Sequence, residues 1–368
     1  MVSKCEVLLR DWLTEEGADR VDIDCQVIHR VARVRVWLTQ NGERNSVYFP
    51  PEIGFELDDI RPSQADPHRG AWLWSHFWME AAEGVLHQES DWMREPVISA
   101  RPIGGADAVV ELERHPRDPE WIPEWMAAKI AAYHEEEARE RLFRKWRHYF
   151  GSEPSREEAG RLHIVLASLT KERLGLCEED YALLAERTDC IINAAANVRH
   201  YGHYEDFSGI NAELIRKLAE LSDRGRKKEI HHISTIGVAE GLIEGKKFFF
   251  YTEKDGDLGQ ADDNYYTSTK REAERHIERL RKEGRDISIY RLGNLIADSG
   301  SGIFQDNIDT NGFYKILRAM ICMGKTAESS IWLPDFSFID QITDAFIRLL
   351  LSEHSHFETY HLLNSSRL

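Results

Sequence analysis

Tyr266 and Lys270 stand four residues apart in the polar run 264–270. Residues at this spacing share one face of an α-helix. A phenol beside an ammonium group can be held partly ionised, because a nearby positive charge favours the phenolate. Such a phenol can exchange a proton with a carbonyl oxygen near neutral pH. The pair predicts a proton-transfer site, although a packed tyrosine and a solvated lysine on a structural helix would show the same spacing.

A short apolar run over 230–235 lies upstream and ends in the hydroxyls of Ser234 and Thr235. This run is typical of a buried strand. A tyrosine, a lysine and a hydroxyl at a strand end together form an apparatus for hydride transfer. We therefore expect Thr235, Tyr266 and Lys270 to face one crevice.

The elements around these residues form a βαβ series. Strands are predicted over 189–196, 230–235 and 286–291, and helical spacing of leucines and isoleucines separates them. Strands alternating with helices predict a parallel sheet covered on both faces. Ligands of such sheets bind at the carboxyl ends of the strands. Ala194, Thr235 and the segment after Arg291 would lie at that edge.

From about residue 142 to 368 the chain resembles the terminal thioester reductase domain of nonribosomal peptide synthetases. That domain is an extended short-chain dehydrogenase/reductase of the NAD-binding male-sterility-like family. The resemblance implies a partial Rossmann-like, doubly wound parallel sheet preceded by a small α+β module. Six segments carry it, in the family's order and spacing: residues 174–176, 193–202, 232–238, 264–274, 290–295 and 302–308.

The resemblance also implies a reaction and its residues. A phosphopantetheinyl carrier domain would present an acyl or peptidyl thioester, and NADPH would reduce it to an aldehyde or an alcohol. Thr235 and Tyr266 would hydrogen-bond the substrate oxygen. Lys270 would lower the tyrosine pKa and hold the nicotinamide ribose. The implied cofactor-binding residues are Asn193, Ala194, Ala195, Ser234, Lys270 and Arg291.

The chain departs from the family at its phosphate-binding turn. The family opens with a strand and a glycine-rich turn that approaches the cofactor pyrophosphate, and no such turn precedes residue 142. Gly104-Gly105 lacks the third glycine and is interpreted as an ordinary turn, and Ser168 stands where the family has an acidic residue near the adenine. We therefore expect weak NADPH binding.

A non-catalytic reductase remnant fused to an unrelated binding module is the alternative, and a sugar-nucleotide epimerase of the same superfamily is a third hypothesis.

The N-terminal part differs in composition, since nine of the ten tryptophans precede residue 150. We expect an α+β module of unknown family over 1–118, a connecting helix over 119–150 and the partial reductase over 151–368. The expected elements of the module are a helix over 5–13, strands over 21–30, 32–38 and 46–49 with a turn at Asn41-Gly42, a helix over 72–86 and a strand over 109–114. A further strand is expected over 164–169.

The formal net charge of −17 disfavours nucleic acids and anionic membranes as partners. The five cysteines are scattered and show no metal-binding spacing, which is typical of a protein from the reducing cytoplasm. No metal site is predicted, because the paired histidines lack a carboxylate cluster in the sequence. No signal peptide and no apolar run long enough to cross a bilayer is found.

Overall fold

The computed structural model describes residues 4–98, 101–199, 201–244, 250–261, 264–309, 311–325, 335–352 and 357–364. His200, in one of the matching segments, lies outside these ranges. The chain forms two compact units, Met1–Arg144 with Pro154–Leu166 and Lys145–Glu153 with Ala167–Leu368. The domain boundaries expected at residues 118 and 150 stay a prediction.

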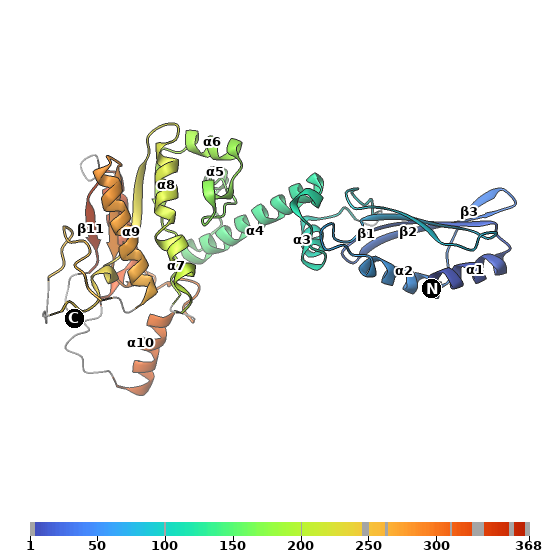
Figure 1. Cartoon of the computed structure of the whole chain (residues 1–368). Helices are drawn as coiled ribbons and strands as arrows, with labels where there is room; N and C mark the ends of the chain where they lie inside the picture. Colours follow the sequence, from blue (N-terminus) through green and yellow to red (C-terminus); the bar gives the residue numbers. More distant parts are fainter. Residues whose placement is uncertain are drawn as a thin grey trace. The chain divides into compact units, whose positions relative to one another are not determined.

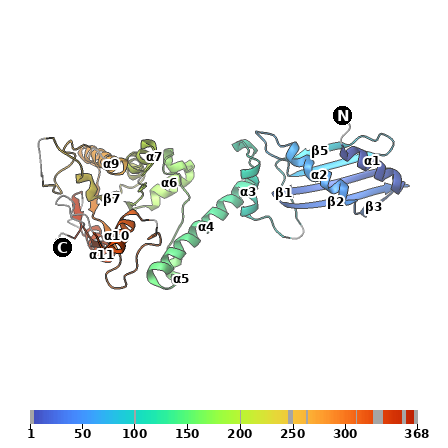
Figure 2. The ribbon, with the colours of Figure 1, turned by 90° about the horizontal axis from the view of Figure 1, so that it is seen from below.

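The N-terminal unit is built on a five-stranded antiparallel sheet of order β3-β2-β1-β4-β5. Val21, Ile23 and Cys25 alternate along β1 and point into the core beneath the two N-terminal helices. Figures 1 and 2 show both helices on the same face of this sheet. The elements are α1 (Lys4–Glu16), β1 (Arg20–Ile28), β2 (Val31–Gln40), β3 (Glu43–Val47), α2 (Pro51–Ser63), β4 (Trp74–Glu80) and β5 (His87–Asp91).

Several expected elements of this unit are confirmed. The first helix and the three-stranded meander are present as α1 and β1–β3. Asn41 and Gly42 both have positive φ, at 52° and 81°, which is the backbone that a two-residue hairpin turn requires. The expected connecting helix is present as η1 (Pro119–Trp121) and α4 (Glu124–Phe150), and α5 (Arg156–Gly160) follows it.

Two predictions for this unit were wrong. The segment expected to be a helix over 72–86 contains strand β4, in which Ser75, Phe77 and Met79 are buried at a period of two. The segment expected to be a strand over 109–114 belongs to helix α3 (Gly105–Arg114). There Glu111 is fully buried and pairs with Arg61, so a long-range contact stabilises the helix.

The second unit contains a four-stranded parallel sheet of order β11-β8-β7-β6. The predicted α/β class with a Rossmann-like parallel sheet is therefore confirmed. The strands are β6 (Cys190–Asn193), β7 (Glu229–Thr235), β8 (Ile287–Leu292) and β11 (Thr359–Leu362), and β9 (Leu295–Ile296) pairs separately with β10 (Ser337–Phe338).

Helices cover both faces of this sheet. Leu218 of α8 and Ile277 of α9 pack with Ile230 in the core of one face. On the other face the ring of Tyr290 contacts Phe346 of α11 at 4.8 Å between ring centroids. The bounds are η2 (Glu172–Gly175), α6 (Glu178–Arg187), α7 (Tyr204–Asn211), α8 (Leu214–Asp223), η3 (Ile236–Ala239), α9 (Tyr265–Lys282), α10 (Gly312–Met323) and α11 (Ile339–Leu350).

The strand predicted over 164–169 is absent, and this prediction was wrong. The segment has no regular structure, and Val165 and Leu166 are exposed. An isolated apolar run needs a neighbouring strand for its backbone hydrogen bonds. Within the described residues β6 pairs only with β7, so β6 forms an edge of the sheet.

None of the helices in the described ranges combines the length and the apolar composition of a transmembrane helix. All five cysteines of the chain are free thiols.

Candidate active site

The carboxyl end of β7 and the first turn of α9 meet at the predicted site. The Asn264 side chain accepts a hydrogen bond of 2.9 Å from the Thr267 amide, which begins the helix just before Tyr266. At the end of β7 the Thr235 hydroxyl accepts a hydrogen bond of 3.1 Å from the Gly237 amide. Local capping bonds thus fix the end of β7 and the start of α9.

Thr235 and Tyr266 face one cleft. Both line a cavity of about 1330 Å³, and interaction with the Thr235 hydroxyl acts to lower the pKa of Tyr266. Gly293 and Asn294, which follow β8, line the same cavity. The cleft therefore opens at the carboxyl ends of the parallel strands, where ligands of such sheets bind. The expected juxtaposition of these two hydroxyls is present.

Lys270 lies behind the cleft and not in its lining. Its ammonium group donates a hydrogen bond of 2.9 Å to the carbonyl oxygen of Ile233, and the side chain is buried. Burial lowers the pKa of Lys270 to about 8, and Glu274 opposes this shift.

The tyrosine differs from its expected tuning. Burial raises the pKa of Tyr266, and only the hydrogen bond with Thr235 acts in the opposite direction. The Lys270 ammonium is hydrogen-bonded to the strand backbone at Ile233. The expected activation of Tyr266 through Lys270 stays a prediction.

His232 is a buried neighbour of the site that the sequence analysis did not single out. Asn193 Nδ2 donates a hydrogen bond of 3.0 Å to His232 Nδ1, and both side chains are buried. Burial and the charge of Lys270 hold the pKa of His232 well below its usual range, so the ring is neutral. Strand alternation on β7 places it on the same side as Ser234, which was the available signal.

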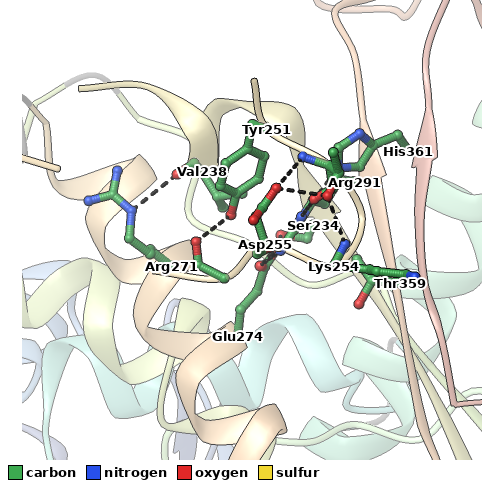
Figure 3. Close-up of polar contacts among 12 residues, drawn as sticks. Ser234, Val238, Tyr251, Lys254, Asp255, Arg271, Glu274, Arg291, Thr359 and His361 are labelled. Atoms are coloured by element: carbon green, nitrogen blue, oxygen red, sulfur yellow. Dashed lines mark hydrogen bonds and ion pairs between the residues drawn. The ribbon is translucent and has the colours of Figure 1, made fainter. Parts of the chain in front are cut away.

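Ser234 and Arg291 meet at the carboxylate of Glu274 (Figure 3). Ser234 Oγ donates to Glu274 Oε1 at 2.5 Å, and Arg291 Nη2 lies 2.7 Å from Glu274 Oε2. Both members of this ion pair are buried. The guanidinium also lies 4.8 Å from the centre of the Tyr251 ring and contacts His361. Their expected role in cofactor binding stays a prediction, since Glu274 holds both side chains.

The residues expected beside the nicotinamide lie at the end of β6. Asn193, Ala194 and Ala195 lie at the carboxyl end of this strand, and the Asn193 side chain accepts a hydrogen bond from the Ala195 amide at 3.3 Å. Small residues there permit a flat ring to approach the backbone. These residues are not among those that line the cavity, and their expected contact with the cofactor stays a prediction.

The pyrophosphate end of the cofactor lacks an equivalent cradle in the described part of the chain. No glycine-rich turn follows a strand beside β6. Gly104 and Gly105 begin α3 in the N-terminal unit, and the Asp107 carboxylate accepts the Gly104 amide at 3.0 Å and pairs with Arg101. A carboxylate therefore already caps that helix terminus, where a phosphate would otherwise bind.

Comparisons with known proteins agree with this architecture. A crystal structure of the terminal R domain from the myxalamid PKS-NRPS biosynthetic pathway superposes with a TM-score of 0.56 at 24% identity, over 64% of this chain and 58% of that one. A thiolation-reductase di-domain from an archaeal non-ribosomal peptide synthetase superposes with a TM-score of 0.53 at 24% identity, over 62% and 61% of the two chains. These likenesses show the shared fold.

The sequence comparison identifies the family. A linear gramicidin synthase of Brevibacillus parabrevis is 27% identical over 208 residues, which are 56% of this chain and 4% of that synthase. The chain thus spans under two thirds of the solved reductases and a small part of the synthase. Residues 122–345, more than half of the chain, match the NAD-binding family described as male sterility protein. The chain belongs to this family, which confirms the resemblance seen in its sequence.

Proposed function

We propose that the chain is an NADPH-dependent thioester reductase that releases a carrier-bound acyl or peptidyl chain as an aldehyde or an alcohol. The observation that carries this proposal is that Thr235 and Tyr266 line one cleft at the carboxyl ends of the parallel strands. Membership of an NAD-binding family and similarity to reductase domains of peptide synthetases support it. The carrier partner is proposed because one similar structure contains a thiolation domain joined to its reductase.

The bound cofactor would supply a hydride to the thioester carbonyl carbon. Thr235 and Tyr266 would hydrogen-bond the carbonyl oxygen, and Tyr266 would deliver the proton as negative charge develops there. The hydroxyl so formed then gives up its proton as the carbon–sulfur bond breaks, which releases an aldehyde and the carrier thiol that takes up this proton. A hydride from a second NADPH and a further proton would convert the aldehyde to the alcohol. Lys270 has three donors. One is engaged by the Ile233 carbonyl, and we assign the others to the nicotinamide ribose.

The alternative is a reductase remnant without catalysis, joined to an unrelated binding module. It is favoured by the missing phosphate cradle in the described residues and by the sheet edge at β6.

The five free thiols support a cytoplasmic location, which we include in the proposal.

The experiment is an assay of the purified chain with NADPH and an acyl thioester of coenzyme A or of a phosphopantetheinylated carrier. Loss of NADPH absorbance together with aldehyde or alcohol in the extract supports the reductase. Absence of product, at protein concentrations that match those of the substrate, supports the remnant. Product formed without NADPH consumption would overturn the proposed reaction.

A further inference from the structure

Two carboxylates and one imidazole meet beside the cleft, and none of them belongs to the proposed proton-transfer site. Glu272 and His276 lie four residues apart on α9, so they share one face of the helix. Glu213 is the residue before the first turn of α8. Packing of α8 against α9 brings one atom of each side chain within 4.8 Å of the other two.

In each carboxylate a donor binds one oxygen, Oε2, and so orients the group. The Tyr204 hydroxyl donates to Glu272 Oε2 at 2.5 Å, and Arg216 Nη1 lies 3.3 Å from Glu213 Oε2. The other oxygen of each carboxylate, Oε1, is directed to His276 Nε2, at 3.7 Å for Glu272 and 3.9 Å for Glu213. Outer donors of this kind typically orient metal ligands.

The distances at His276 are too long for hydrogen bonds. They are close to the separation of two ligands on one ion, which is roughly 3.3 Å for a tetrahedral site with metal–ligand distances of about 2.0–2.1 Å. His276 Nε2 is inaccessible to solvent and has no hydrogen-bond partner among the described residues. A buried polar atom without a partner needs an explanation such as an ion or an ordered water.

We propose that Glu213, Glu272 and His276 bind one divalent transition-metal ion, and that Zn²⁺ is the preferred ion. One imidazole nitrogen and two carboxylate oxygens form a three-ligand set that suits zinc, with a fourth position for water. The side chains are 15% exposed for His276, 25% for Glu272 and 39% for Glu213, so an ion can enter from solvent. The positive ion would offset two adjacent negative charges.

The site has a structural consequence for the cleft. Tyr204 and Glu272 both line the cavity that contains Tyr266. An ion bound by α9 and by the start of α8 would fix Glu272, and through it the Tyr204 hydroxyl, in this cleft wall. The proposal does not depend on the reductase reaction, because binding can be measured without substrate or cofactor.

The test is calorimetric titration of the full chain with Zn²⁺ after treatment with a chelator, which is removed before the titration. The wild-type chain should bind one ion that His276→Gln and Glu213→Gln each remove. Tyr204→Phe should weaken this site by about 10–100-fold, as loss of an outer donor does. His163→Gln, at an exposed histidine of the other unit, serves as the matched control and should bind as the wild type does.

Replacement of Zn²⁺ by Co²⁺ gives a second readout, because ligand-field absorption reports on the donor set. The wild-type spectrum should be lost in both ligand variants. The proposal is overturned if the wild-type chain binds no ion, or if both ligand variants bind with unchanged affinity. If His276→Gln fails to fold by circular dichroism, Glu213→Gln decides, since it replaces a half-exposed side chain by one of the same shape.

Discussion

Lys270 and Ile233 are joined by a hydrogen bond of 2.9 Å from the ammonium group to the backbone carbonyl oxygen. This bond ties α9 to β7 two residues before Thr235. One helical turn earlier on the same face, Tyr266 lines the cleft together with Thr235. The buried lysine thus sets the position of the helix that presents the tyrosine, in addition to its proposed contact with the ribose.

The first prediction concerns the proton donor. Tyr266→Phe removes the phenol from the cleft and should lower the rate of thioester reduction about 10²–10⁴-fold. Tyr149→Phe, at a tyrosine that does not line the cleft, should retain the wild-type rate. Initial rates of NADPH oxidation at saturating thioester measure both. A Tyr266→Phe enzyme as fast as the wild type would rule out the assigned chemistry.

The second prediction concerns the cofactor. We expect weak NADPH binding, because backbone amides that would cradle the pyrophosphate are not seen in the described residues. Titration followed by cofactor fluorescence measures the affinity, and a low-micromolar dissociation constant would contradict the prediction. Asp107→Asn removes the carboxylate that caps the Gly104 amide at α3. The affinity should not change in this variant, and a large change would locate the phosphates at that helix terminus.

The third prediction concerns the buried ion pair. Glu274→Gln leaves the Arg291 guanidinium buried without its counter-charge and should destabilise the second unit by about 3–5 kcal/mol. The exposed pair Arg348–Asp344 is the control, and Asp344→Asn should leave the stability nearly unchanged because solvent screens this pair. Urea unfolding followed by far-UV circular dichroism measures both. Equal effects of the two substitutions would show that solvent screens the Glu274 pair as well.

The fourth prediction is a pH dependence of stability. The pKa of His232 is lowered in the folded state, so below its usual value the unfolded chain takes up a proton that the folded chain does not. The second unit should therefore lose about 1.4 kcal/mol of stability for each pH unit below about 6.5. Above about pH 6.5 His232 is neutral in both the folded and the unfolded chain, so it causes no loss of stability there.

Unfolding midpoints at about pH 7.5 and about pH 5.5 test this dependence. His232→Asn should show a smaller loss between the two values, because asparagine does not titrate, whereas His163→Asn should behave as the wild type. Tryptophan fluorescence reports mainly on the N-terminal unit, where most tryptophans lie, and separates its transition from that of the sheet. An equal pH response in all three proteins would contradict the assignment to His232.

The sequence by itself determined the elements whose signals are local. Helical spacing of Tyr266, Lys270 and Ile277 and the short apolar runs at β6, β7 and β8 predicted a parallel sheet that contains these three strands. The same spacing placed the tyrosine and the lysine on one face of α9. These patterns are fixed by backbone geometry over a few residues, and the tertiary contacts agree with them.

Where the conformation of a segment depended on distant partners, only the tertiary structure decided whether it formed a strand, a helix or neither. Part of the segment 72–86 forms strand β4 because β1 lies beside it and pairs with it. The segment 109–114 is helical, and its Glu111 pairs with the distant Arg61. Residues 164–169 form no strand, because among the described residues no other strand pairs with them. In the same way, the spacing of residues along the chain did not predict that Lys270 bonds to Ile233 or that Glu213 lies 3.9 Å from His276. Such contacts depend on how helices dock against a sheet.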